Sequence, residues 1–219
     1  ATGCRLLRAL TRQIKTAIQL GPDGWNHRPD MRAKEIELEG MTMGVVGFGG
    51  TGRAIAKRAV AFGMSVLAVD ALSVPASDGV DEVWTLDRLD DLLAASDVVA
   101  IGAPLTPETL GVIDDRAFSA MRRGAIIMNV TRGEIIDGEA LVTALRDGRC
   151  GGAALDVAPE EPLPADHPLW SFDNVVMTPH TAGASQLRGP RNIARFCENL
   201  RLAQAGSPLT GVVDKQAGF

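Results

Sequence analysis

The 219-residue sequence lacks the features that mark membrane-spanning, secreted or nucleic-acid-binding chains. No apolar run reaches the roughly 20 residues that a membrane-spanning helix needs, so we expect no membrane partner. Basic residues interrupt the first apolar segment, which therefore has no signal-peptide core: Arg5, Arg8, Arg12 and Lys15. The net charge is -5 and no basic run stands out, so we also expect no nucleic-acid partner.

Cysteine is scarce as well. The three cysteines, Cys4, Cys150 and Cys197, are odd in number and far apart, with neither metal-ligand spacing nor a disulfide framework. We therefore expect no bound metal, and we expect a reducing compartment, the cytoplasm. Apolar residues make up 46% and charged residues 22% of the chain, which is typical of a soluble globular protein.

Short apolar segments alternate with helical patterns from residue 41 onward. Apolar runs rich in Val, Ile, Ala and Met predict strands at 43–48, 64–69, 98–101, 125–130, 152–157 and 174–178. Helical spacing predicts helices at 52–62, at Leu86–Leu93, at 115–122 and at Ala140–Leu145, the last closed by Gly148. Strands that alternate with helices predict an α/β fold, a Rossmann-type doubly wound parallel sheet with helices on both faces.

Two further helical segments flank this pattern. Apolar residues at helical spacing predict one helix over residues 4–20, which ends at a Gly-Pro pair. The polar residues 21–40 are expected to form a connector. Residues 184–205 again have a helical pattern and follow an acidic, proline-rich loop at 158–173.

A glycine-rich turn follows the first predicted strand. The segment Gly47-Phe48-Gly49-Gly50-Thr51-Gly52 has the pattern G-x-G-x-x-G between a strand and a helix. There the first glycine permits a tight turn, the second lets the backbone approach a pyrophosphate, and the third lets the helix pack closely on the strand. The helix N-terminus then offers N–H groups to the phosphates. A glycine-rich turn without a ligand is the alternative, and the surrounding pattern favours a dinucleotide.

Asp70 ends the second predicted strand, 18 residues after Gly52. An acidic side chain at this point can accept hydrogen bonds from both ribose hydroxyls of a dinucleotide, and it repels a 2′-phosphate. The alternative is a solvated acid at a strand end. With the glycines before it, we interpret Asp70 as a ribose ligand and predict NAD rather than NADP as the cofactor.

Three residues of complementary chemistry follow other predicted strands. Arg132, Glu161 and His180 each stand beyond a strand end, so in a parallel sheet they point to the one edge where ligands bind. An arginine can bind a carboxylate and polarise a carbonyl. A histidine exchanges protons near neutral pH, and a nearby carboxylate favours its charged form.

Each of these residues has a plain structural alternative. Arg132 could be a surface arginine, Glu161 a solvated carboxylate in an acidic loop, and His180 a buried structural histidine. Their joint arrangement supplies substrate anchoring, polarisation and a proton, which is what hydride transfer to a ketone requires. We therefore interpret the set as catalytic.

These motifs resemble the cofactor domain of the D-isomer-specific 2-hydroxyacid dehydrogenases. That family includes glyoxylate and hydroxypyruvate reductases, phosphoglycerate dehydrogenase and D-lactate dehydrogenase. The matching segments run through nearly the whole chain, at Gly40–Gly52, Pro104–Thr109, Asn129–Gly133, Ala154–Pro162 and Thr178–Gly183.

The resemblance implies a role for each matching position. Arg132 would bind the carboxylate and carbonyl of the substrate, and His180 would be the acid/base, hydrogen-bonded to Glu161. Asp156 would hold the amide of the nicotinamide. The other implied cofactor-binding residues are Gly47, Gly49, Gly50, Thr51, Gly52, Asp70, Ala103, Pro104, Val130, Thr131 and Gly183.

The resemblance also implies how the chain is organised. Residues 1–182 would form the dinucleotide-binding domain, and the helix at 1–20 resembles the family's dimerisation arm, which implies a homodimer. Residues 183–219 would be a C-terminal helix and tail that return toward a substrate domain. In the family a domain of roughly a hundred residues precedes the cofactor domain, and we expect most of it to be missing from this chain.

We therefore expect an NAD-dependent oxidoreductase that reduces small 2-oxo acids to D-2-hydroxy acids. The alternative is a truncated, inactive NAD(H)-binding protein that acts through dimerisation or regulation. Formate dehydrogenase is a relative whose pattern has Gln where Glu161 stands. Dehydrogenases for 3-hydroxy acids share the glycine turn but rely on a lysine that we cannot place in this sequence.

Overall fold

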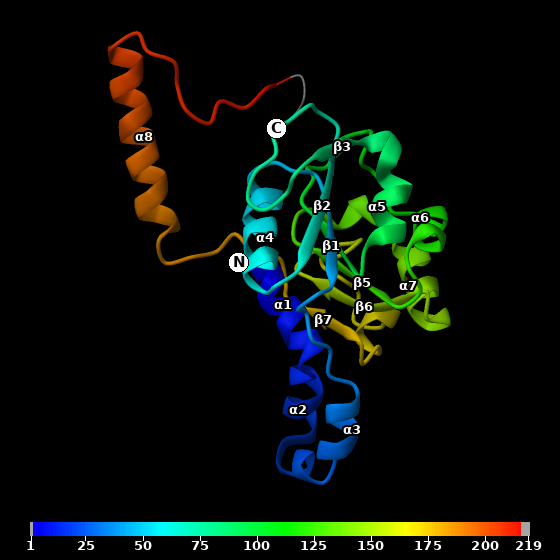
Figure 1. The fold of residues 1–219 in the computed structure, drawn as a ribbon. Coiled ribbons are helices and arrows are strands. Elements are labelled where there is room, and N and C mark those ends of the chain that lie inside the picture. Colours follow the sequence, from blue (N-terminus) through cyan, green and yellow to red (C-terminus); the bar gives the residue numbers. More distant parts are fainter. Residues whose placement is uncertain (1, 216–219) are drawn as a thin grey trace. The chain divides into compact units, whose positions relative to one another are not determined.

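Seven parallel strands form the centre of the fold in the computed structural model, which describes residues 2–215 (Figure 1). The strands are β1 Thr42–Val46, β2 Ser65–Asp70, β3 Val83–Thr85, β4 Val98–Ile101, β5 Ala125–Asn129, β6 Cys150–Leu155 and β7 Val175–Met177. Their order across the sheet is β3-β2-β1-β4-β5-β6-β7, and every neighbouring pair is parallel. This confirms the predicted doubly wound sheet. The order reverses between β1 and β4, where such sheets bind ligands beyond the strand ends.

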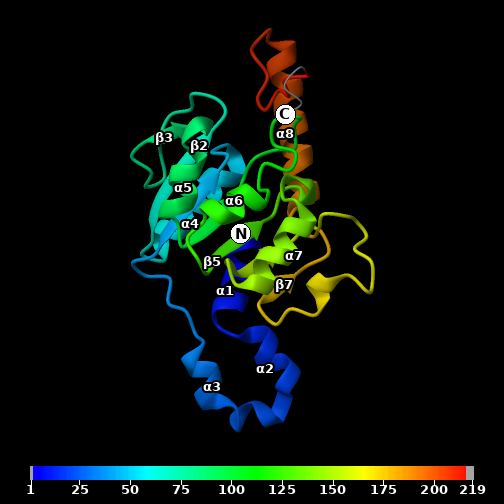
Figure 2. The same cartoon turned by 90° about the vertical axis from the view of Figure 1, so that its right-hand side faces the viewer.

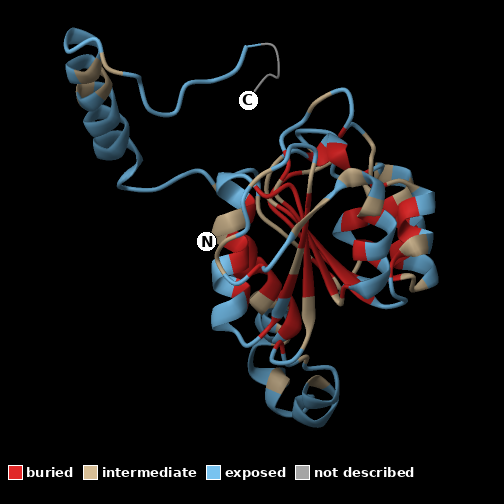
Figure 3. Ribbon diagram, turned by 45° about the horizontal axis from the view of Figure 1, so that its top comes forward, coloured by how far each residue is buried: buried red, intermediate tan, exposed pale blue. Residues whose placement is uncertain are grey.

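Helices cover both faces of this sheet (Figure 1). On one face lie α1 (Thr2–Thr11) and α4 (Gly50–Ala61), and on the other α5 (Leu89–Ala95), α6 (Asp115–Ala120) and α7 (Gly138–Asp147). Short 3-10 helices precede α5 and α7, η2 at Leu86–Arg88 and η3 at Gly133–Ile135. Alternate strand residues face the two helical layers, so the buried residues concentrate in and around the sheet (Figure 3).

The predicted single helix at 4–20 is wrong, because the chain breaks at Gln13. α1 ends at Thr11, and Gln13 takes a left-handed conformation with φ 52°. α1 buries Leu7 and Leu10, whereas the next helix, α2, buries none of its residues. α1, the first half of the segment predicted as a dimerisation arm, therefore packs into the body of the domain, and the role of residues 1–20 in a dimer stays a prediction.

The segment after the break protrudes from the α/β body in two perpendicular views (Figures 1 and 2). It consists of α2 (Ile14–Leu20), the 3-10 helix η1 (Gly21–Trp25) and α3 (Arg28–Ala33), so the predicted connector at 21–40 contains two short helices. None of the three elements has a buried residue. Ile18 and Trp25 are 74% and 80% exposed, which leaves large apolar side chains uncovered in a single copy.

Several other short elements were not predicted from the sequence, among them β3 and η4 (Pro168–Trp170). β3 is three residues long and lies at the sheet edge with no buried residue, so it lacks the apolar run that marks the central strands. The loop predicted at 158–173 contains one 3-10 turn, η4 at Pro168–Trp170. Both elements are too short to leave a periodic pattern in the sequence.

The residues from Gly183 onward form a second compact unit, distinct from the one that extends to Ala182. Its helix α8 (Arg188–Gln204) lies in the segment where a helix was predicted and has no buried residue, and Phe196 is 69% exposed. Asn199 fixes the following turn, because its amide donates to the carbonyl of Thr210 (3.0 Å) and accepts the Thr210 N–H (2.9 Å). No helix in the described part of the chain has the length and apolar character to cross a membrane.

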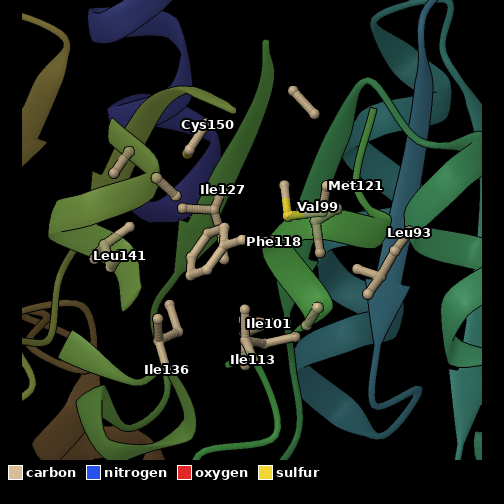
Figure 4. Packing of buried hydrophobic residues seen from close by; sticks show 14 of the residues in the cluster. Leu93, Val99, Ile101, Ile113, Phe118, Met121, Ile127, Ile136, Leu141 and Cys150 are labelled. Carbon is tan, nitrogen blue, oxygen red and sulfur yellow. The ribbon is translucent and has the colours of Figure 1, made fainter. Parts of the chain in front are cut away.

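Phe118 of α6 lies at the centre of the apolar cluster between the sheet and α5–α7 (Figure 4). Its side chain is 1% exposed and packs in the same cluster as Ile101, Ile127 and Leu141. The cluster joins α6 and α7 to the central strands, so the position of these helices depends on it.

We predict that Phe118→Ala lowers the free energy of unfolding by about 3–5 kcal/mol, because it removes a large buried ring and leaves a cavity. Urea denaturation followed by circular dichroism measures the change. Leu110→Ala is the matched control, since Leu110 is 62% exposed and its loss should cost less than about 0.5 kcal/mol. A similar small cost for Phe118→Ala would contradict the packing described.

Candidate active site

The glycine turn lies between β1 and α4, where the strand order reverses. Gly47 has φ 90°, a conformation that suits glycine and strains other residues. A Cβ on Gly47 would lie 2.4 Å from the nitrogen of Ala103, and one on Gly52 would lie 2.0 Å from the Gly47 carbonyl oxygen. Gly102, which follows β4, is equally close, since its Cβ would lie 2.6 Å from that oxygen. Larger residues would force β1, α4 and β4 apart.

Gly49 and Gly50 differ from these glycines, because a Cβ on either would meet no atom within 4 Å. The fold itself therefore does not require glycine at these two positions. α4 begins at Gly50 with no side-chain cap, and Thr51 is exposed in its first turn. Uncapped N–H groups and the helix dipole at such an end favour an anion such as a pyrophosphate.

Asp70 lies beside this turn. One carboxylate oxygen accepts a hydrogen bond from the N–H of Phe48 (2.6 Å), and the other accepts one from the N–H of Leu72 (2.9 Å). Each carboxylate oxygen can accept more than one hydrogen bond, so Asp70 retains capacity for the hydroxyls of a ribose. The structure thus joins Asp70 to the glycine turn with which the sequence analysis associates it.

Four other predicted cofactor positions follow β4 and β5. Ala103 is 5% exposed and packs against Gly47, so it shapes the turn more than it offers a side chain to a ligand. Pro104 is exposed, and Val130 and Thr131 are half-buried. All four stand at the carboxyl edge of the sheet, after two neighbouring parallel strands.

A turn after β5 holds Arg132. Asn129, the fully buried last residue of β5, donates to the Arg132 carbonyl (2.8 Å) and accepts the N–H of Thr131 (3.1 Å). Gly133 permits a close approach to the loop after β6, because its Cβ would lie 1.6 Å from the carbonyl oxygen of Ala158. The guanidinium of Arg132 is exposed and donates to the Thr131 carbonyl (2.8 Å).

Asp156, which follows β6, organises the turn after β7. It is fully buried, and its carboxylate accepts the N–H groups of Thr181 (3.1 Å) and Ala182 (2.7 Å) and the hydroxyl of Thr178. Its carbonyl oxygen accepts the N–H of His180 (2.7 Å). One buried residue therefore fixes the turn that carries the predicted acid/base, while its contact with the nicotinamide stays a prediction.

His180 and Glu161 meet at this edge. Nδ1 of His180 lies 2.7 Å from Oε2 of Glu161, whose other oxygen accepts the N–H of Ala158 (3.0 Å). His180 has φ 52°, a left-handed conformation that costs a non-glycine residue about 1–3 kcal/mol. Its neighbours must therefore hold it in place. Within the described residues Nε2 makes no hydrogen bond, and the side chain is 45% exposed, so this nitrogen is available to a ligand.

The charge on Glu161 follows from its surroundings. Partial burial raises the pKa of this carboxyl, whereas the hydrogen bonds from His180 and Ala158 and the positive charges of His180 and Arg132 lower it. The net direction is downward, so the carboxyl is ionised at neutral pH. The structure thus brings His180 and Glu161 together. The turn that carries Arg132 lies against the same loop, because Gly133 closely approaches Ala158.

A cavity of about 570 Å³ adjoins the pair. Glu161 and His180 line one part of it, and Leu163, Trp170 and Met177 give another part an apolar wall. The pair itself is open to solvent, with side-chain exposures of 45% for His180 and 39% for Glu161, so a small ligand can reach it.

Sequence reasoning missed residues that shape this site from within, namely Gly102, Asn129 and Thr178. Each ends a strand or follows one directly, and that position is the signal that could have found them.

Gly183, predicted as a cofactor ligand, is exposed and begins the second unit, so its role stays a prediction. Among residues 2–215 no group of three or more His, Cys, Asp or Glu side chains could hold a metal ion.

Comparison with known proteins gives a consistent match. Residues 4–182 match the model for "D-isomer specific 2-hydroxyacid dehydrogenase, NAD binding domain". The chain is 39% identical over 194 residues to a hydroxypyruvate reductase from Blautia hydrogenotrophica, an alignment that covers 87% of this chain. It spans 59% of that relative's length, so it corresponds to about three-fifths of the longer protein.

Two solved structures have the same fold. The D-lactate dehydrogenase of Lactobacillus jensenii, solved with NAD+, aligns with a TM-score of 0.80 and 26% identity over 97% of this chain and 67% of its own. A D-isomer-specific 2-hydroxyacid dehydrogenase from Xanthobacter autotrophicus, solved with NADPH, aligns with a TM-score of 0.76 and 30% identity over 98% of this chain and 90% of its own. These two neighbours were thus solved with different dinucleotides.

We predict that His180→Ala raises the pKa of the Glu161 carboxyl toward its ordinary value, because the hydrogen bond and positive charge that lower it are lost. In the unchanged protein, the stabilisation from this carboxylate is present above the unfolded-state pKa and is lost as the pH falls through the lowered value. A carbon-13 NMR titration of the Glu161 carboxyl measures both proteins. His167→Ala is the matched control, and an unchanged midpoint in His180→Ala would contradict the pairing.

Proposed function

Since this chain belongs to the D-isomer-specific 2-hydroxyacid dehydrogenases through its NAD-binding domain, we propose that it serves the reduction of small 2-oxo acids to D-2-hydroxy acids. The observation that carries the proposal is the His180–Glu161 pair, which stands at the same sheet edge as the glycine turn. Relatives named for hydroxypyruvate, glyoxylate and phosphoglycerate support small substrates of that kind.

The residues around the glycine turn fit a dinucleotide. The backbone of Gly49 and Gly50 would meet the pyrophosphate, because open space lies over both and the helix end behind them is uncapped. Asp70 would accept hydrogen bonds from the ribose and repel a 2′-phosphate, which favours NAD over NADP. When bound, the reduced nicotinamide supplies the hydride that converts the carbonyl of the substrate to an alcohol.

His180 would act as the general acid and base. With Nδ1 on the Glu161 carboxylate, the free Nε2 can donate a proton to the carbonyl oxygen as that oxygen gains negative charge, and can take it back in the reverse direction. Glu161 would hold the ring in one orientation, since its lowered pKa keeps the carboxylate ionised and able to accept the hydrogen bond from Nδ1. His180 would therefore transfer the proton, and Glu161 would orient the imidazole ring.

Arg132 would anchor the substrate. Its exposed guanidinium can bind a carboxylate through two parallel hydrogen bonds and can polarise the neighbouring carbonyl. The buried Asn129 fixes the turn that carries Arg132, so the backbone position of this residue is well defined. A 2-oxo acid presents its carboxylate and carbonyl side by side, as this arrangement requires.

The proposal extends to assembly and location. A homodimer would cover the apolar side chains of the protruding segment, among them Ile18 and Trp25. The free cysteines Cys4, Cys150 and Cys197 fit a reducing compartment, the cytoplasm.

We predict that His180→Ala reduces NADH oxidation by small 2-oxo acids about a hundredfold or more, because the variant lacks the positioned general acid. The assay follows NADH absorbance with glyoxylate, hydroxypyruvate and pyruvate, and NADH fluorescence measures binding separately. Binding should stay within about twofold, since His180 is remote from the glycine turn in the chain and in the sheet order.

His167→Ala serves as the control, because His167 caps η4 through the N–H of Leu169 and lies outside the pair. Full turnover in His180→Ala would contradict the assignment of the acid/base. If the unchanged chain binds NADH but turns over none of the 2-oxo acids, the proposed reduction is contradicted. The proposed binding of NAD is then still supported.

A further inference from the structure

The loop at residues 71–79 joins β2 to the segment before β3 and begins directly after Asp70. Leu72 is 54% exposed, and Val74 is the loop's partly buried apolar residue against the cluster beneath α4. A loop with so few buried apolar contacts opens readily unless polar bonds hold it. Its conformation matters because it borders the carboxylate predicted to bind the ribose.

Arg53, in the first turns of α4, holds this loop through hydrogen bonds. Its guanidinium donates to the carbonyl of Pro75 (2.7 Å) and to the hydroxyl of Ser77. Within residues 2–215 these are the hydrogen bonds that link the loop to an element other than β2 and its own continuation. The planar fork of arginine suits two acceptors at once, which a lysine ammonium cannot match in geometry.

The same guanidinium also covers the glycine turn. It lies 4.5 Å above the ring of Phe48, whose N–H donates to one oxygen of Asp70. The other oxygen of Asp70 accepts the N–H of Leu72, at the start of the loop. Arg53 therefore contacts both segments that hold the carboxylate, the glycine turn on one side and the loop on the other. The contacts run from Arg53 to Phe48, from Phe48 to Asp70, from Asp70 to the loop, and from the loop back to Arg53.

We propose that Arg53 is a positioning residue for the adenosine half of the dinucleotide, which it serves by holding the 71–79 loop so that Asp70 faces the ribose. The inference rests on the proposed binding of NAD at the glycine turn and assigns a further positioning residue to that site. The acceptors of Arg53 are a neutral carbonyl and a hydroxyl, so within the described residues its charge has no direct carboxylate partner.

The test uses ligands that represent the two halves of the cofactor. Dissociation constants of ADP-ribose, by calorimetry, and of nicotinamide mononucleotide, by NMR, are measured for the unchanged chain, Arg53→Ala and Arg53→Lys. Arg58→Ala is the matched control, because Arg58 lies on the same helix and donates to the Ala54 carbonyl within it. Melting temperature and hydrogen exchange of the Leu72 amide are recorded for each protein.

We expect both Arg53 variants to bind ADP-ribose about tenfold more weakly, with the mononucleotide unaffected and the Leu72 amide exchanging faster. Arg58→Ala should match the unchanged chain in every measurement. Tight ADP-ribose binding by Arg53→Ala would overturn the inference and leave NAD binding intact. Wild-type affinity in Arg53→Lys would also overturn it, since charge alone would then suffice. Failure of the unchanged chain to bind ADP-ribose would overturn the proposed function itself.

Discussion

The site depends on one close backbone approach, where β1, α4 and β4 meet. Gly47, Gly52 and Gly102 lie so near one another that a single added Cβ would bring atoms within 2.0 to 2.6 Å. This contact sets the start of α4 directly against the end of β1, and it aims the first-turn N–H groups beyond the sheet edge. The neighbouring Gly49 and Gly50 face open space, so the same turn combines a packed side with an accessible one.

A second constraint fixes the chemical groups. Asn129 and Asp156 are fully buried polar residues at the ends of β5 and β6, and each satisfies its side chain with the backbone of a turn that carries a reactive residue. Burial makes such bonds costly to break, because an unpaired polar group would be left without water. The side chains of Arg132 and His180 are thus exposed, while the backbone that carries each of them is fixed by hydrogen bonds. The left-handed backbone of His180 is maintained in this way, by the carbonyl and carboxylate of Asp156, which follows β6.

The sequence predicts the strands and helices of the body because each buried strand leaves an apolar run and each helix an apolar period. The break at Gln13 escaped prediction, since Ile14 and Ile18 continue the helical spacing although neither is buried. The strand-end positions of Arg132, Glu161 and His180 were predictable because all strands are parallel. The bonds of Asn129 and Asp156 were not, because they join segments that only the folded sheet brings together. Arg53 is a similar case, since its acceptors lie on a loop with no periodic pattern.

The central claim is that the open side of the glycine turn binds a dinucleotide. The most direct measurement is an NADH fluorescence titration of Gly49→Ala beside the unchanged chain. A Cβ at Gly49 meets no atom within 4 Å and its φ is -78°, so the variant should fold with an unchanged melting temperature. The account predicts a loss of NADH affinity of about tenfold or more, because the methyl group would occupy the path of the pyrophosphate. Equal affinity in the two proteins would contradict it.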